Sequence, residues 1–119
     1  DSTGWGNYSN AMINLTKGRY NTNSGNSSST WTAVIVGKKD KELLLTTGAS
    51  EDVSKMNIYD FAGNEFEWTL EQYINNSSIP CTSRGGCYYN YGFNYPASDH
   101  LYGSTSDGNS STGFRTVLY

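Results

Sequence analysis

The 119-residue chain has few of the residues that build metal sites and disulfide scaffolds. One histidine and two cysteines leave no Cys/His cluster to propose as a metal site. Cys81 and Cys87 lie six positions apart, and both a small loop disulfide and two free thiols remain open interpretations. A disulfide-based scaffold is excluded.

Basic clusters and long apolar runs are also missing. Eight Lys and Arg against eleven Asp and Glu give a net charge of -3, which argues against nucleic-acid binding because phosphate must be neutralised. No apolar run approaches the roughly 18 residues of a membrane span, so no membrane insertion is predicted. The start at Asp1, without an initiator Met or signal peptide, predicts a domain taken from a longer protein.

Asn, Ser, Thr and Gly dominate the composition, yet aromatic residues make up 14% of the chain and include three Trp. Disordered chains rarely carry so much material for a core. The length fits one domain. We therefore predict a single loop-rich domain over residues 1–119.

The clearest periodicity predicts a half-buried strand within residues 64–71, where Phe66, Trp68 and Leu70 alternate with polar residues. Leu43 to Leu45 form a buried run of undefined secondary structure. Helix is expected only as one or two short turns within residues 8–20 or 50–56. The composition further predicts an exposed loop at Asn23–Thr30 and strands at Trp31–Val36, Arg84–Tyr91 and Phe114–Tyr119.

Three motifs in the second half resemble one known family. Residues 57–69 resemble the N-x-Y-D-x-A-G-N-x-x-E-W-T signature of the formylglycine-generating-enzyme-like (sulfatase-modifying-factor) proteins. Arg84-Gly85-Gly86 and Gly113-Phe114-Arg115 match its R-G-G and G-F-R elements in the same order. The resemblance implies an α+β, C-type-lectin-like fold with a small antiparallel sheet, long loops and little helix. The expected scaffold residues are Asp60, Gly63, Asn64, Glu67, Trp68, Arg84, Gly85, Gly86, Gly113, Phe114 and Arg115.

Two departures from the family pattern matter. The upstream L-P-T-E-x-E-W segment is missing, so we expect the chain to lack the first part of the full domain. The enzymes carry two copper-binding catalytic cysteines after R-G-G, whereas this chain has only Cys87 there. We therefore expect no enzyme activity and no cofactor.

Several scaffold residues allow two interpretations. Asn64 and Glu67 are a weak calcium candidate, because hard oxygen ligands suit calcium. The alternative is that Asn64 caps the turn and Glu67 hydrogen-bonds backbone amides. Arg84 and Arg115 could bind an acidic ligand, or form buried ion pairs and backbone hydrogen bonds that lock the frame. Asp99-His100 beside serines does not amount to a hydrolase site.

The family's non-enzymatic branch includes phage and bacterial binding proteins diversified by retroelements, with the variable region between R-G-G and G-F-R. Such diversification mutates the adenines of AAY codons, in which Y is a pyrimidine. The first two bases are thereby randomised, and the resulting NNY codons cannot encode Lys, Glu, Gln, Trp or Met. Residues 87–112 contain none of these five types, whereas residues 1–86 contain 16. A static segment with the same bias would pass this test too.

The segment 87–112 also has the chemistry of an antibody-like binding surface, in which Tyr gives rigid contacts and Ser, Gly and Asn give adaptable hydrogen bonds. An alternative is that alternate aromatics pack inward from a strand. The predicted ligand-binding residues are Tyr88, Tyr89, Asn90, Tyr91, Phe93, Asn94, Tyr95, Asp99, His100, Tyr102, Ser104, Asp107 and Asn109.

The sequence thus predicts a ligand-recognition module on a phage tail tip or a bacterial surface. Its partner would be a protein or glycan receptor on a bacterial cell, and related tail proteins are often trimers. One alternative is a structural tail or decoration protein whose Tyr-rich face is buried in an assembly. The other is a formylglycine-generating oxidase, which the cysteine positions disfavour.

Overall fold

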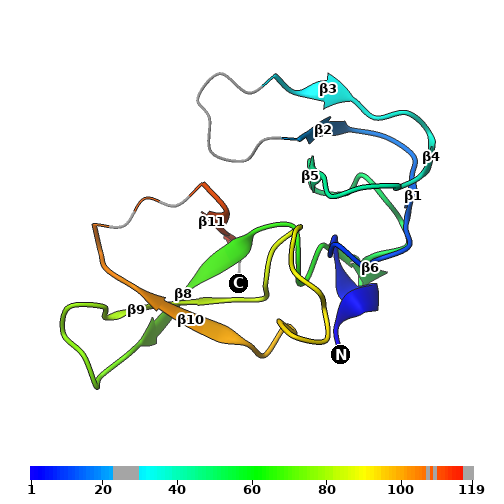
Figure 1. Cartoon of the computed structure of the whole chain (residues 1–119). Helices are drawn as coiled ribbons and strands as arrows, with labels where there is room; N and C mark the ends of the chain where they lie inside the picture. The colour runs from blue at the N-terminus through cyan, green and yellow to red at the C-terminus, as the bar shows by residue number, and fades with distance from the viewer. Residues whose placement is uncertain (23–29, 107, 109, 117–119) are drawn as a thin grey trace.

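The polypeptide forms short strands joined by long loops (Figure 1). The computed structural model describes residues 1–22, 30–106, 108 and 110–116. Within these ranges the helical element is a 3-10 turn, η1 (Thr3–Trp5), and no helix is long and apolar enough to cross a membrane. The strands are β1 (Asn14–Leu15), β2 (Arg19–Asn21), β3 (Thr32–Ala33), β4 (Gly37–Lys38), β5 (Leu44–Leu45), β6 (Ser54–Lys55), β7 (Ile58–Tyr59), β8 (Phe66–Gln72), β9 (Cys81–Arg84), β10 (His100–Gly103) and β11 (Thr112–Phe114).

The largest sheet has four strands in the order β10-β9-β8-β11. β9 pairs antiparallel with both β8 and β10, whereas β11 pairs parallel with β8. The sheet is therefore mixed, not purely antiparallel as expected. The prediction of little helix is confirmed, and the described residues form no α-helix. This β-rich architecture is compatible with a C-type-lectin-like fold.

The strand predicted within residues 64–71 exists as β8, but fewer of its apolar side chains point inward than expected. Phe66 is buried and Trp68 is half-buried, whereas Leu70 is fully exposed. Three residues, 69–71, lie between Trp68 and Gln72 on β8, whereas only Thr82 lies between their partners Ser83 and Cys81 on β9. This bulge interrupts the ladder that would have carried Leu70 inward, so the predicted alternation fails there.

The main hydrophobic core is built largely from the first half of the chain. Leu43 to Leu45 are buried as predicted, and Leu44 and Leu45 form β5. Tyr8, fully buried, is the largest side chain inside. The core cluster comprises Tyr8, Ala11, Ile13, Leu15, Leu43, Leu45, Ala49, Val53 and Ala62.

Other local predictions were wrong. Residues 31–36 form only the two-residue β3, and Ile35 and Val36 are exposed, because β-branched side chains favour a strand only where they pack. The residues 8–20 and 50–56 contain strands and turns and no helical turn; the helical turn lies at Thr3–Trp5.

Two predicted strands in the second half also have different bounds. The strand expected at 84–91 is instead β9, which ends at Arg84 because Gly85 and Gly86 take φ values of +93° and +68°. The strand expected at 114–119 is β11, which ends at Phe114, and residues 117–119 lie outside the described part. So does most of the predicted loop at 23–30.

Candidate functional site

The site is built on the turn at residues 60–64, immediately before β8. Asp60, Gly63 and Asn64 have φ values of +49°, +71° and +62°. A Cβ on Gly63 would lie 2.9 Å from the backbone carbonyl of Asn7, so only glycine allows the turn to lie flush against the N-terminal segment. The turn therefore fixes β8 relative to the core.

The buried side chain of Asn64 hydrogen-bonds both backbone polar groups of Leu45, as a neighbouring strand would. Its Nδ2 donates to the Leu45 carbonyl at 2.9 Å, and its Oδ1 accepts from the Leu45 amide at 2.9 Å. Oδ1 also accepts from Nδ2 of Asn7 at 2.9 Å. Asn64 thus ties the turn to β5, which differs from the predicted turn cap. Within the described ranges no three His, Cys, Asp or Glu side chains gather as metal ligands.

We call the motifs Arg84-Gly85-Gly86 and Gly113-Phe114-Arg115 the two frames. The first frame is held by the same turn and by Tyr8. The Gly63 amide donates to the Gly85 carbonyl at 2.7 Å, and the Tyr8 hydroxyl lies 2.7 Å from that same oxygen. A Cβ on Gly86 would lie 2.8 Å from the Tyr95 carbonyl oxygen. Glycine is therefore required where the chain turns away from β9.

The two frame arginines form ion pairs, as one interpretation predicted, but the pairs are partly exposed and not buried. Arg115 donates to both carboxylate oxygens of Glu67, and its Nη1 and Nη2 donate to the carbonyls of Tyr59 and Asp60. The hydrogen bond to Glu67 raises the pKa of Arg115. Glu67 therefore pairs with an arginine instead of the predicted backbone amides.

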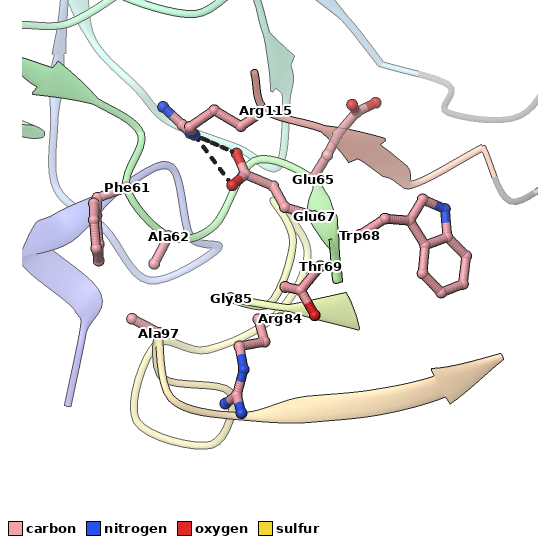
Figure 2. A pocket seen from close by; sticks show the side chains of 10 residues that line it. All are labelled: Phe61, Ala62, Glu65, Glu67, Trp68, Thr69, Arg84, Gly85, Ala97 and Arg115. Atoms are coloured by element: carbon pink, nitrogen blue, oxygen red, sulfur yellow. Dashed lines mark hydrogen bonds and ion pairs between the residues drawn. The ribbon is translucent and has the colours of Figure 1, made fainter. Parts of the chain in front are cut away.

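An open cavity of about 280 Å³ lies between the two frames. Figure 2 shows Glu67 facing Arg115 at its rim, with the indole of Trp68 pointing away. Burial, followed by the charge of Glu67, raises the pKa of Glu65 in its wall. The lining residues among those described are Phe61, Ala62, Glu65, Glu67, Trp68, Thr69, Arg84, Gly85, Ala97 and Arg115. These include two glutamates and one threonine, and no cysteine, serine or histidine.

The first predicted ligand-binding cluster is only partly on the surface. Tyr88 is 7% exposed and its amide donates to the Asn64 carbonyl at 3.0 Å, so its assignment to the binding face was wrong. Tyr89, Tyr91 and Phe93 are 43%, 49% and 58% exposed. The rings of Tyr91 and Phe93 stack with centroids 5.6 Å apart. We call residues 89–94 the aromatic turn.

The aromatic turn is anchored to the N-terminal segment through its backbone. The Ser2 amide donates to the Gly92 carbonyl at 3.0 Å, and the Gly92 amide donates to Oδ1 of Asn10 at 3.1 Å. The Ser9 amide donates to the Asn90 carbonyl at 2.8 Å. Gly92 packs so closely on Thr3 that a Cβ would lie 2.5 Å from the Thr3 amide nitrogen. The exposed rings therefore stand on a fixed backbone.

The remaining polar members of this cluster differ in accessibility. Asn90 is half-buried, and its Oδ1 accepts from the amide of Cys87 at 2.9 Å and from its thiol at 3.1 Å. Asn94 is exposed. Tyr95 is half-buried, and its carbonyl oxygen lies 2.7 Å from the Tyr8 hydroxyl. Asn90 and Tyr95 thus also hold the turn in place.

The second predicted cluster lies elsewhere, on β10. His100 and Tyr102 are exposed, Asp99 and Ser104 are half-buried, and the Tyr102 ring stacks on Tyr73 with centroids 3.8 Å apart. In Figure 1 the loop before β10 lies near the N-terminus, and β10 runs away from it toward the turn between β8 and β9. The predicted surface is therefore split in two. Asp107 and Asn109 lie outside the described residues.

Tyr73 and Glu71 belong to this second surface, although no motif identified them. Glu71 accepts from Nε and Nη2 of Arg84 at 2.8 and 2.9 Å. A signal was available, because the alternation of Glu67, Thr69 and Glu71 continues to Tyr73. Extending the strand pattern by one more step would have predicted Glu71 and Tyr73 on one face.

Both cysteines are free thiols, so the structure favours that interpretation over the disulfide. Cys87 is fully buried, and burial raises the pKa of its thiol. A buried thiol with a raised pKa is a poor nucleophile, because the thiolate is the reactive form.

Comparison with known proteins gives a match to a family model. The family model described as the sulfatase-modifying factor enzyme 1-like domain matches residues 3–119. No curated protein matches the chain, and no solved structure does.

Proposed function

The chain belongs to the sulfatase-modifying factor enzyme 1-like family, and from that premise we propose that it is a non-enzymatic member that recognises a ligand. The ligand is a protein or glycan receptor on a bacterial cell, bound from a phage tail tip or a bacterial surface, in an assembly that could be trimeric. The aromatic turn is the main contact.

The observation that carries this proposal is the pair of exposed, stacked rings of Tyr91 and Phe93 on an anchored backbone. Rigid aromatic side chains lose little entropy on binding and supply most of the energy at interfaces. Anchoring through Ser2, Ser9 and Asn10 lowers the cost of ordering the turn when a ligand binds.

The chemistry of the cysteines supports recognition over oxidation. Cys87 is the one cysteine after the Arg84-Gly85-Gly86 frame, and its thiol is buried and engaged with Asn90. Copper(I) titration with a sulfatase-peptide turnover assay tests the alternative. Turnover would replace the recognition proposal with an oxidase.

The composition of residues 87–112 supports retroelement diversification of the proposed surface. A near-identical template repeat in the source genome, close to a reverse transcriptase and differing only at adenines, is the expected finding. Its absence would remove diversification and leave a static receptor binder.

The proposed function is tested by incubating the fluorescently labelled chain with a panel of intact bacterial strains and measuring retention by flow cytometry. We expect saturable binding to a subset of strains. Retention by no strain would contradict the proposal.

A structural role in a phage particle would use the same exposed rings in a different way. The structure of the assembled particle distinguishes the two. Tyr91, Phe93 and Tyr102 buried against another subunit would support the structural role.

A further inference from the structure

A second hollow is lined by residues of β8, β9 and β10. Figure 1 shows where these strands lie in the main sheet. The hollow has a volume of about 380 Å³, and its lining residues belong to β8, β9 and β10, together with Tyr73, which follows β8. Such a volume lies in the range of roughly 300–1,000 Å³ that is typical of small-molecule sites. Its principal walls are Glu71, Gln72, Tyr73, Arg84, His100 and Tyr102, and we call it the sheet hollow.

The aromatic part of the sheet hollow is a stacked pair with an imidazole at its edge. The rings of Tyr73 and Tyr102 are 3.8 Å apart and inclined by 20°, and His100 meets Tyr102 edge-on at 5.2 Å. Tyr102 is 41% exposed. The Tyr73 amide donates to the Pro80 carbonyl at 2.9 Å, and this hydrogen bond fixes the backbone of Tyr73. The hollow therefore offers a flat, partly exposed and preformed ring surface.

The polar part is equally fixed. Arg84 donates to both carboxylate oxygens of Glu71 at 2.8 and 2.9 Å, and its Nη1 donates to the Ser98 carbonyl at 2.6 Å. The carboxylate of Glu71 is 51% exposed as a side chain and keeps acceptor capacity toward solvent. A bidentate pair held at three points presents donors and acceptors in one set geometry.

The charge balance argues for an uncharged ligand. Arg84 forms an ion pair with Glu71 and also interacts electrostatically with Asp99. These two carboxylates balance the positive charge of Arg84. An anionic ligand would lack a counter-charge. An apolar peptide side chain would pack on the rings but would give the exposed Glu71 carboxylate no hydrogen-bond donor.

We propose that the sheet hollow binds a neutral saccharide, with a pyranose ring packed on the Tyr73–Tyr102 pair and its hydroxyl groups bonded to Glu71, Arg84 and Gln72. The apolar C–H face of a sugar suits an aromatic surface, and its adjacent hydroxyls suit planar polar groups. This inference rests on the proposed recognition function and assigns a ligand class to the second of its two surfaces.

The test uses the full chain on a broad array of immobilised neutral and anionic saccharides, followed by saturation-transfer NMR with the strongest neutral binder. Tyr102→Ala should weaken that binding by at least about fivefold through loss of ring packing. Glu71→Gln, which keeps the side-chain shape, should weaken it as well. Met12→Ala removes a side chain that is 94% exposed elsewhere and should leave binding unchanged.

The inference is overturned if the array shows no neutral binder, if only anionic saccharides bind, or if Tyr102→Ala and Glu71→Gln both bind as the wild type does. Circular dichroism of each variant confirms that the fold is kept. Retention on bacterial strains is measured separately. Strain binding without saccharide binding defeats this inference alone, whereas failure to bind any strain defeats the proposed function.

Discussion

The hydroxyl group of Tyr8 lies 2.7 Å from the carbonyl oxygen of Tyr95 and 2.7 Å from that of Gly85. One fully buried side chain from the N-terminal segment thus joins the two ends of the loop that carries the aromatic turn. Burial raises the pKa of Tyr8, which keeps the hydroxyl protonated as a donor.

Replacing Tyr8 with Phe should remove this link without changing the shape of the core. We expect a loss of about 1–2 kcal/mol in unfolding free energy, because the carbonyl oxygens of Gly85 and Tyr95 stay buried with fewer partners. Urea denaturation measures the loss. Amide hydrogen exchange should accelerate at residues 86–95 more than in β5, and equal protection in both proteins would show that Tyr8 does not hold the loop.

Gly86 should not tolerate a side chain. Its φ of +68° disfavours other residues, and a Cβ would lie 2.8 Å from the Tyr95 carbonyl oxygen and 2.9 Å from Cε1 of Tyr8. Gly86→Ala should therefore cost about 2 kcal/mol or more. Gly4→Ala is the matched control, since nothing lies within 4 Å of the added Cβ there. Similar thermal unfolding midpoints for the two variants would refute the tight packing at Gly86.

Lys39 should make stability depend on pH in the alkaline range. Its ammonium group donates to Oδ1 of Asn7 at 2.9 Å and to the Tyr8 carbonyl, and burial lowers its pKa to about 8. The ordinary pKa of about 10.4 applies in the unfolded chain. Between these values the unfolded state binds more protons, so the free energy of unfolding rises as pH increases.

The alkaline rise is measured by urea denaturation between about pH 8 and 10.4, the window set by those two pKa values. Lys39→Gln removes this titrating group and should make the slope less positive than that of the wild type. The exposed Lys38→Gln is the control and should retain the wild-type slope. Burial raises the pKa of the Cys87 thiol, which opposes the rise, so the comparison is between variants. A wild-type slope no steeper than that of Lys39→Gln would contradict the burial of Lys39.

The parts of the structure that short motifs specify could be predicted from the sequence. Alternation places Phe66 inside on β8, and the residues Asp60 to Asn64 form the turn that their composition indicates. The two glycine-arginine frames bracket the candidate segment as the family resemblance implied. These features depend on residues close together in the chain, so the local pattern carries them.

Long-range contacts could not be predicted in the same way. Asn7 and Tyr8 hold residues 64, 85 and 95, but they sit in an Asn- and Ser-rich segment without periodicity. Tyr88 and Tyr89 are neighbours of the same type, and their composition does not indicate that Tyr88 lies inside and Tyr89 outside. The division of the predicted surface arises likewise from β10 pairing with β9.

The central claim is that the aromatic turn makes the receptor contact, and titration of the labelled chain onto a retained bacterial strain tests it most directly. The double variant Tyr91→Ala/Phe93→Ala should bind at least about tenfold more weakly than the wild type, as expected for removal of aromatic anchors. Met12→Ala, exposed elsewhere, should bind as the wild type does. Equal affinity of the double variant and the wild type, with both proteins folded, would contradict the account.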